Sequence, residues 1–334
     1  MEGFDTMTEI GSGGVDGPVV LVTGARGFVG SALVGHLRRA GYQVVAASRD
    51  MSSNAAARLL PEPEHASDEE FDRLLVGIDH VVHLAAIAHT RLRGEESRHA
   101  YHVGNYLLTK RLAEAAARTT SGRFLFISSS RAQCGASFSG ILTEACAPEP
   151  ADDYGRAKLA GEKAVAEALP KARFSILRPV LVYGPGVKGN FATLQRLAAL
   201  PIPLPLAALT ARRSLLDRDA LCRAIVHCLR APATQGGTYL VADARPLAVC
   251  DIMTAVREGM GRAANLFAVP PWLLGIAAGF LRQRARWETL SRDLVADPAL
   301  LIATGWKPQE DSAKAIRQGI AATRAETVDF AESP

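Results

Sequence analysis

The sequence predicts an α/β fold, a doubly wound parallel sheet with a smaller C-terminal α/β lobe. Val19 to Val22 form a continuous apolar run, typical of a strand buried on both faces of a parallel sheet. The run leads directly into a glycine-rich turn and a helical stretch at residues 31–39. At 334 residues the chain exceeds the usual size of a single core, so an appended lobe is expected.

The glycine-rich turn predicts a dinucleotide site. Gly24 permits a tight turn, Gly27 lets the backbone approach a pyrophosphate, and Gly30 allows helix and strand to pack closely. Phe28 and Val29 lie between the turn and this helical stretch and are expected to contact the cofactor, and the free N–H groups and positive dipole at the start of the helix suit an anion. A strand before the turn and a helix after it are the context that such a site requires.

Composition narrows the class of protein. Hydrophobic residues make up 48% of the chain, which is enough for a large core, and the formal net charge is only +4. No dense block of Lys and Arg occurs, so we expect affinity for small anions and no nucleic-acid footprint. The five cysteines are odd in number and widely spaced, which argues against a disulfide framework and predicts no metal site.

Three segments are expected. Residues 1–17 are glycine-rich and lack the apolar core of a signal peptide, so they predict a disordered tail and a cytoplasmic protein. Residues 18–180 form the expected dinucleotide-binding domain. Residues 181–334 form mainly the lobe, with residues 212–245 packing back on the larger domain.

The longest apolar run, Trp272 to Leu281, is too short to span a bilayer. It follows Pro270 and Pro271 and predicts a helix. We expect this helix to pack on the core of its own lobe, and a membrane-facing or partner-facing helix is the alternative.

The Thr-Gly-x-x-Gly-x-x-Gly pattern that starts at Thr23 resembles the short-chain dehydrogenase/reductase superfamily, specifically its extended branch, the NAD-dependent epimerase/dehydratase family. The resemblance covers most of the chain and implies a Rossmann-type fold. It also implies that the C-terminal lobe binds substrate. If the family habit holds, the helices at residues 100–119 and 154–169 form a homodimer interface.

The second strand, residues 41–47, ends at Ser48 and Arg49. In a dinucleotide fold this position meets the adenosine ribose, where an acidic residue would bind the 2′-hydroxyl of NAD. A hydroxyl and a guanidinium suit a 2′-phosphate better, with Arg26 as a second phosphate contact. NADP is therefore favoured as cofactor, while Asp50 keeps NAD as the alternative.

The third strand cannot be placed within residues 51–77. Residues 80–86 are the expected fourth strand, whose end, Leu84, Ala85 and Ala86, resembles the family motif beside the cofactor. His89 and Arg91 follow, and an ordinary loop histidine is the favoured interpretation of His89.

The helical segment at residues 100–119 contains Asn105, which matches the asparagine that supports the active site in this family. In the family this residue bends the helix and orders water. A polar residue on an exposed face is the alternative interpretation.

Residues 123–128 form the expected fifth strand. Alignment with the family pattern makes Ser130 the catalytic hydroxyl that holds the reacting oxygen, and Ser129 takes this role if the register shifts by one. Cys134 is expected to be a packing thiol.

Tyr154 and Lys158 are four residues apart at the start of a helical run, so their side chains share one helix face. A phenol has a pKa near 10, and an ammonium nearby is expected to lower that pKa and suit the tyrosine to proton transfer. The resemblance implies the same pair as catalytic and cofactor-binding groups, with Lys158 binding the nicotinamide ribose.

Arg131 and Ala132 stand where sugar 4,6-dehydratases of this branch carry an acidic pair, so elimination is unsupported. Residues 172–177 predict the sixth strand. The Arg-Pro turn that follows, with Pro179 and Val182, resembles the turn whose backbone meets the nicotinamide carboxamide.

The resemblance assigns Asn190 and Arg213 to the substrate diphosphate, because an amide and a guanidinium suit that anion. The expected partner is therefore a nucleotide-diphosphate sugar. Reduction of a 4-keto sugar is the first hypothesis and a UDP-sugar 4-epimerase is the second. Reduction of a non-nucleotide ketone and a non-catalytic dinucleotide sensor are the remaining alternatives.

Overall fold

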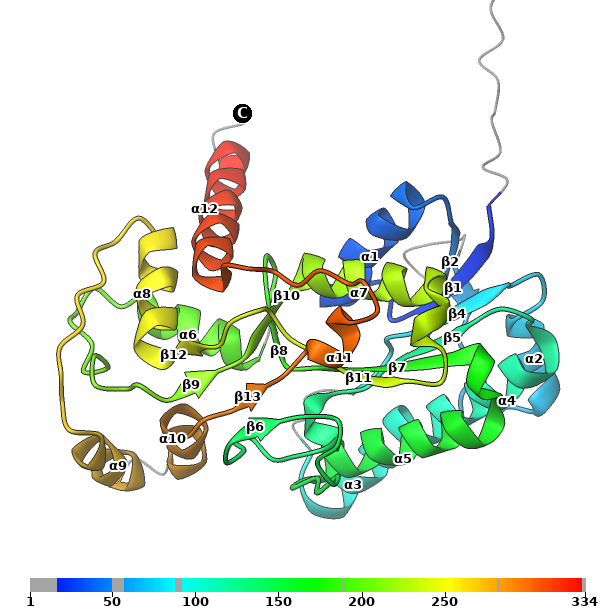
Figure 1. Cartoon of the computed structure of the whole chain (residues 1–334), viewed down its shortest axis with the longest axis horizontal. Coiled ribbons are helices and arrows are strands. Elements are labelled where there is room, and N and C mark those ends of the chain that lie inside the picture. The colour runs from blue at the N-terminus through cyan, green and yellow to red at the C-terminus, as the bar shows by residue number, and fades with distance from the viewer. Residues whose placement is uncertain (1–16, 50–56, 88–91, 188, 281–282, 332–334) are drawn as a thin grey trace, which may run out of the picture.

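The computed structural model describes residues 17–49, 57–87, 92–187, 189–280 and 283–331, with some side chains left out near Asn190, in α10 and at the C-terminus. Figure 1 shows a larger part built on one sheet and a smaller lobe beside it, from which the C-terminal helix rises. Most of the expected tail, Asp50, His89 and Arg91 lie outside the described residues, as does the side chain of Asn190.

The larger part is organised around a seven-stranded sheet in which every neighbouring pair is parallel. The strand order is β11-β7-β5-β4-β1-β2-β3. This confirms the predicted doubly wound sheet, whose order reverses between β1 and β4. The strands are β1 (Val19–Thr23), β2 (Gln43–Ser48), β3 (Arg58–Leu59), β4 (His80–His83), β5 (Phe124–Ile127), β7 (Phe174–Pro179) and β11 (Thr238–Val241).

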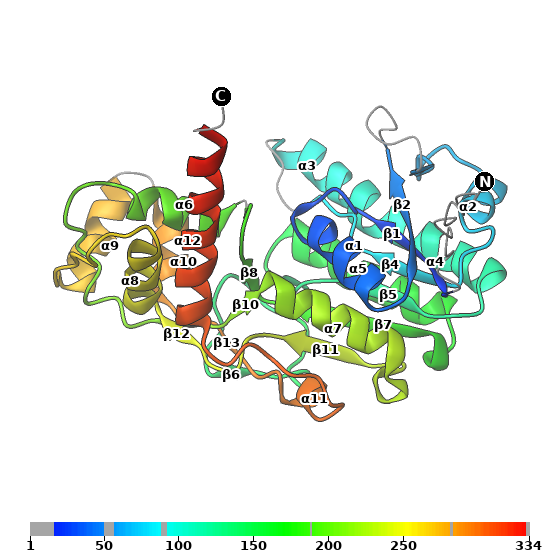
Figure 2. The same cartoon turned by 90° about the horizontal axis from the view of Figure 1, so that it is seen from above.

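Helices cover both faces of the sheet, because its strands carry apolar side chains on both sides. On one face, α1 (Phe28–Arg39) and α7 (Arg218–Arg230) pack through Leu33 and Ile225. On the other, α2 (Asp68–Leu74), α4 (Leu108–Thr119) and α5 (Asp153–Ala168) pack through residues such as Phe71 and Leu112. Figure 2 shows α1 and α7 lying over the strands.

Four differences from the sequence-based boundaries bear on the site. The helix expected at residues 31–39 begins earlier, at Phe28. The third strand is β3, which is only two residues long and too short to leave a pattern. The helix expected at residues 100–119 is divided into α3 (Gly94–Tyr101), a π-helical turn η1 (His102–Leu107) and α4. The fourth strand ends at His83, because its partner strand β1 ends at Thr23, the residue paired with His83.

The smaller lobe has its own core around Tyr183, Phe191, Val256 and Ile316. Its helices are α6 (Asn190–Ala198), α8 (Val249–Gly259), α9 (Pro271–Phe280), α10 (Arg284–Ser291) and α12 (Ser312–Ala331), and α11 (Ala299–Ile302) lies near β11. Three short strand pairs complete the structure: β8 (Leu181–Tyr183) with β10 (Leu215–Asp217), β9 (Arg212–Arg213) with β12 (Leu247–Ala248), and β6 (Ile141–Leu142) with β13 (Val295–Ala296). Single turns of 3-10 helix occur at η2 (Ser130–Ala132), η3 (Lys171–Arg173) and η4 (Pro232–Thr234).

The prediction that α9 packs on the core of its lobe is wrong. Within this helix the structure describes no buried residue, and Trp272, Ile276 and Phe280 are exposed. The physical reason is that an apolar run in the sequence does not specify which surface the helix packs against. No helix in the described ranges has the length and apolar content needed to cross a membrane.

Candidate active site

The residues predicted to bind cofactor converge on one edge of the main sheet, because the carboxyl ends of parallel strands meet there. The glycine turn follows β1, and Ser48 and Arg49 close β2. Ala85 and Ala86 follow β4, while Pro179 closes β7. The edge therefore gathers side chains from four separate strands at the position where a doubly wound sheet binds ligand.

The glycine turn fits a dinucleotide closely. Gly24 has a φ of +71°, and an added Cβ would lie 2.9 Å from the Ala85 backbone nitrogen. At Gly30 an added Cβ would clash with the Gly24 carbonyl oxygen. Gly27 precedes α1 without a side-chain cap, so the first N–H groups of the helix, around Phe28 and Val29, are available to a phosphate.

Asn105 fixes the loop that follows β4. Its side chain is fully buried, with the amide oxygen 2.7 Å from the Ile87 N–H and the amide nitrogen 2.9 Å from the Ile87 carbonyl. It lies within the π-helical turn η1, where an inserted residue bends the helix, and π-turns frequently mark functional sites. The exposed-residue interpretation of Asn105 is therefore wrong, because the helix bend turns it toward the strand end.

Tyr154 lies in the first turn of α5, whose N-terminus is capped by Asp152 through a 2.8 Å bond from the Gly155 N–H. The Tyr101 ring packs edge-on against the Tyr154 ring with centroids 5.9 Å apart. Burial raises the pKa of Tyr154 to about 12, while a hydrogen bond with the Ser129 hydroxyl and the charge of Arg131 oppose this rise.

Lys158 lies one turn further along α5 and is 1% exposed. Its ammonium donates to the Ile127 carbonyl at 2.8 Å and lies 4.7 Å from the centroid of the Phe126 ring. Burial lowers the pKa of Lys158 to about 7, and Glu162 opposes this shift. The expectation that Lys158 lowers the pKa of Tyr154 is wrong for this structure, because burial dominates both groups.

The two serines after β5 are placed differently. Ser129 is half-buried; its hydroxyl accepts from the Arg131 N–H at 3.2 Å and lies close enough to Tyr154 to lower the pKa of that phenol. Ser130 is 3% exposed and begins η2, with its carbonyl accepting from Gln133 and Cys134. The structure thus brings Ser129 to the tyrosine, which is the shifted register of the sequence-based alignment.

The two residues that stand where sugar 4,6-dehydratases carry an acidic pair have no carboxylate. The Arg131 guanidinium pairs with Asp152, the residue that caps α5. Ala132 is fully buried and offers no proton donor. Arg131 also lies close enough to Tyr154 to influence its pKa, which no spacing rule indicated.

A buried polar cluster lies beneath the site. Glu162 of α5 accepts two hydrogen bonds from Arg178, at 2.9 and 2.6 Å, and one from the Ser128 hydroxyl at 2.5 Å. The Arg178 guanidinium also donates to the Gln133 side chain at 3.0 Å. Because α5, β5 and β7 all contribute, this cluster fixes the helix that carries Tyr154 and Lys158 relative to the sheet.

Other predicted cofactor residues lie around the same edge. Ser48 is half-buried and Arg49 is exposed, as is Arg26 in the glycine turn. Val182 lies half-buried in β8, just beyond Pro179. These positions leave Arg49 on the surface at the end of β2, where the adenosine side of the cofactor is expected.

The predicted substrate residues lie in or next to the lobe. Arg213 of β9 is 9% exposed, and its guanidinium donates to the carbonyls of Ala136 and Arg292 at 2.9 and 3.1 Å. Asn190 begins α6, and its side chain lies outside the described part. A cavity of about 430 Å³ between the Gly184 turn and α12 contains none of the catalytic candidates.

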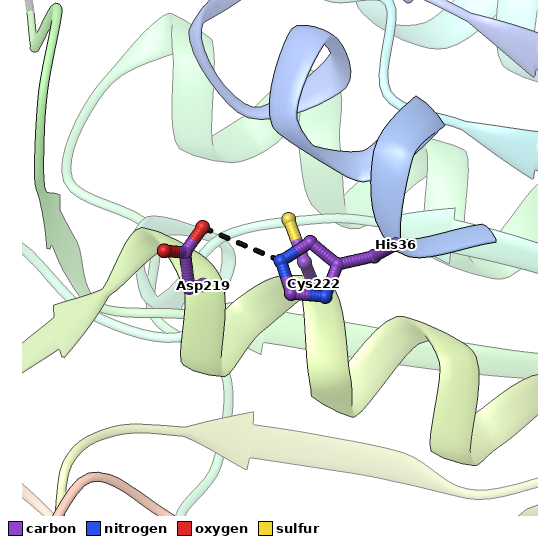
Figure 3. Close-up of side chains that lie close together, drawn as sticks. All are labelled: His36, Asp219 and Cys222. Carbon is purple, nitrogen blue, oxygen red and sulfur yellow. Dashed lines mark ion pairs between the residues drawn. The ribbon is translucent and has the colours of Figure 1, made fainter. Parts of the chain in front are cut away.

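One group of possible metal ligands occurs in the described chain, between α1 and α7. His36 lies 3.4 Å from the Asp219 carboxylate, and the Cys222 thiol is within 4.8 Å of both (Figure 3). The Arg218 guanidinium, 3.7 Å from Asp219, supplies the positive charge that a cation would need to displace. Arg223 also lines the adjoining pocket, so we assign no metal to this cluster.

The glycine turn and the Ser129, Tyr154 and Lys158 group together define a dinucleotide-dependent enzyme of the extended short-chain dehydrogenase/reductase type. The chain belongs to the NAD dependent epimerase/dehydratase family, whose model matches residues 20–242.

The chain is also similar to individual proteins. A UDP-glucose 4-epimerase from Vibrio cholerae is 30% identical over 90% of this chain and 93% of its own length. A ceramide reductase from Caulobacter vibrioides is 29% identical over 87% of this chain and 86% of its own. The solved structure of a UDP-glucuronic acid 4-epimerase from Bacillus cereus in complex with NAD has a TM-score of 0.69, with 21% identity, over 92% of this chain and 99% of that one.

Proposed function

We propose that this enzyme is an NAD-dependent UDP-sugar 4-epimerase. The observation that carries the proposal is the placement of Tyr154 and the buried Lys158 one turn apart on α5, with Lys158 bonded to the Ile127 carbonyl at the end of β5 and Ser129 close by. The absence of carboxylates at Arg131 and Ala132 argues against elimination. The likeness to a UDP-glucose 4-epimerase over nearly the full length of both chains supports epimerisation over net reduction.

The protein groups divide the proton chemistry between them. Tyr154 accepts the proton of the sugar 4-hydroxyl as that carbon becomes a ketone, and it returns the proton after the sugar has turned over. Ser129 donates a hydrogen bond to the same oxygen and holds it at the phenol. Lys158 places a cation next to the strand end and binds the ribose hydroxyls of the cofactor.

The cofactor that suits this sheet edge is a nicotinamide dinucleotide, which supplies the hydride chemistry when bound. Gly24, Gly27 and Gly30 would hold its pyrophosphate near the start of α1, and side chains added at Gly24 or Gly30 would collide with backbone. Asn105 keeps the loop after β4 in the shape that borders the nicotinamide side. We favour NAD because an epimerase returns the hydride to the same substrate, and the B. cereus epimerase was solved with NAD.

In this proposal, Arg213 and Asn190 bind the diphosphate of the substrate. Arg213 bridges the loop at Ala136 and the segment at Arg292, so it lies where the lobe meets the larger part. Ser130 remains a candidate for the sugar side of the site. We further propose a homodimer through the outer faces of α4 and α5.

Reduction of a ketone by NADPH is the second candidate. Arg49 at the end of β2 suits a 2′-phosphate, and one relative is a ceramide reductase. Titration of NADP⁺ and NAD⁺ with Arg49→Ala separates the two. If the enzyme uses NAD, the ratio of its NADP⁺ and NAD⁺ affinities should change by no more than about threefold in the variant. A loss of NADP⁺ affinity of about tenfold or more supports the reductase.

The proposal is tested by product analysis. UDP-glucose, UDP-N-acetylglucosamine and UDP-glucuronic acid are incubated separately with enzyme and NAD⁺, and products are identified by NMR at C4. We expect a C4 epimer from at least one of them without net formation of NADH. Oxidation of NADPH by 4-keto sugars, with no epimer from any of the three, contradicts the proposal.

A further inference from the structure

Arg218 lies where the larger part of the molecule meets the lobe. It is the first residue of α7, whose N-terminus is capped by Asp217 through a 2.8 Å bond from the Ala220 N–H. Figure 2 shows α7 beginning beside β8 and β10, between the lobe and the larger part. The Arg218 side chain is only 18% exposed. A charge enclosed in this way requires specific contacts that compensate its lost hydration.

Two contacts of the Arg218 guanidinium reach opposite sides of this junction. Nη1 donates to the Pro185 carbonyl at 2.7 Å, in the turn between β8 and α6. The central carbon of the guanidinium lies 5.6 Å from the centroid of the Phe28 ring, within the range of a cation–π contact. Phe28 is the first residue of α1 and directly follows Gly27 of the glycine turn. Arg218 therefore joins the glycine turn to the turn that leads into the lobe.

The groups at this junction are packed closely. A Cβ added to Gly184, which precedes Pro185, would lie 3.0 Å from the Arg218 Cβ and 3.8 Å from Cζ of Phe28. Among the described residues, the buried Arg218 Nε has no hydrogen-bond partner, and the half-exposed Asp219 carboxylate is 3.7 Å away. An exposed ion pair at this distance is weak. The guanidinium is therefore held mainly by the Pro185 carbonyl and the Phe28 ring.

The position of Phe28 matters for the cofactor. Its backbone N–H is among the first of α1, which no side chain caps and which are available to a phosphate. A hydrogen bond to phosphate depends on distance and direction, so a shift of this backbone weakens it. Gly24 and Gly27 precede Phe28, and glycine restricts the backbone least of all residues. The anchored ring therefore supplies rigidity that the turn itself lacks.

We propose that Arg218 is a positioning residue for the dinucleotide. It holds the Phe28 ring against the Pro185 turn and thereby fixes the N–H groups that receive the pyrophosphate. This role rests on the proposed binding of the cofactor at the glycine turn, and it does not depend on which sugar or ketone the enzyme converts. Because NAD and NADP share the pyrophosphate, Arg218 has the same effect on both.

The test is titration of the full chain with NADH and with NADPH, followed by the fluorescence of the nicotinamide. Arg218→Met removes the charge and the donor, and we expect it to weaken binding of both nucleotides by about fivefold or more. Arg218→Lys keeps the charge but not the planar group that reaches both partners, so its affinity should lie between those of wild type and Arg218→Met. The matched control is Arg223→Met, an exposed position on the same helix, which should bind as wild type.

A double-mutant cycle with Phe28→Leu shows whether Arg218 acts through the ring. Phe28→Leu keeps an apolar side chain but removes the cation–π contact. Replacing Arg218 should therefore cost less affinity in the Phe28→Leu background than in wild type. If Arg218→Met does not fold, Arg218→Lys completes the same cycle.

Four results would overturn the proposal: a loss below about fivefold in Arg218→Met, full affinity in Arg218→Lys, an equal loss in Arg223→Met, or the same loss in both backgrounds of the cycle. The proposed function is judged separately by product analysis. Wild-type protein that binds NADH but forms no epimer contradicts that function, while the affinities of the variants still decide the role of Arg218. Wild-type protein that binds neither nucleotide contradicts both.

Discussion

Glu162 and Arg178 form a buried ion pair, with the two carboxylate oxygens 2.9 and 2.6 Å from Nε and Nη2 of the guanidinium. Both side chains are less than a tenth exposed. The pair joins α5 to β7, so the position of Tyr154 depends on it.

Glu162→Gln keeps the shape of the side chain but leaves the Arg178 charge buried without its counter-ion. We expect the free energy of unfolding to fall by about 3 kcal/mol, as for other broken buried pairs. Urea unfolding measures this change. Glu167→Gln, an exposed position on the same helix, is the matched control, and an equal effect of the two variants contradicts the structural role of the pair.

Features set by local contacts could be predicted from the sequence, and features that depend on distant parts of the chain could not. The β1 run and the glycine turn were predictable because each glycine is required by contacts within a few residues or with the adjacent loop. The two-residue β3 and the exposed α9 were not, because strand pairing and burial depend on distant surfaces. The choice between Ser129 and Ser130 depends on a single-residue register that no local rule fixes.

The serines provide the second prediction. Ser129→Ala should lower kcat by about tenfold to a hundredfold, because it removes the hydroxyl that bonds with Tyr154. Ser130→Ala is the matched control and should have a smaller effect on kcat. Steady-state kinetics of both variants decide which serine is the catalytic one. A larger loss of kcat in Ser130→Ala would support Ser130, as the family alignment predicts.

The pH dependence of the rate provides the third prediction. Burial holds the pKa of Tyr154 at about 12, so proton acceptance by this phenol should become faster as pH rises. The Arg131 charge lowers that pKa, and Arg131→Met should therefore move the rising limb to higher pH by about half a unit or more.

The control for this prediction is Arg156→Met. Arg156 lies on the same helix and is exposed, with its ion pair directed to Asp153. Its replacement should leave the pH profile of kcat in place. Identical profiles for Arg131→Met and wild type would show that Arg131 has no influence on the proton transfer.

His83 makes the fold sensitive to acid. Its ring is buried between the hydroxyls of Thr23 and Thr109, at 2.7 and 2.9 Å, and burial and the Lys158 charge lower its pKa to about 3. Between this value and the unfolded pKa near 6.5 the unfolded chain binds more protons. Stability should therefore fall as pH drops below about 6.5, by roughly 1.4 kcal/mol per pH unit from this residue.

His83→Phe removes the titrating group while keeping a ring against Phe126. The variant should be less stable at neutral pH, because two hydroxyls lose a partner. Its dependence on pH between about 4 and 6 should nevertheless be flatter than that of wild type. Urea unfolding at several pH values measures both quantities. If the plots of unfolding free energy against pH were parallel for the variant and wild type, His83 would not be the cause of the acid sensitivity.

The most direct test of epimerisation is the fate of the hydrogen at C4. The UDP-sugar accepted by the enzyme is prepared with deuterium at C4 and incubated with enzyme, NAD⁺ and an excess of unlabelled NADH. An epimerase should produce the C4 epimer with the deuterium retained and no NADH consumed, and Tyr154→Phe should slow this by about a hundredfold or more. Loss of deuterium from C4 together with consumption of NADH would contradict the account.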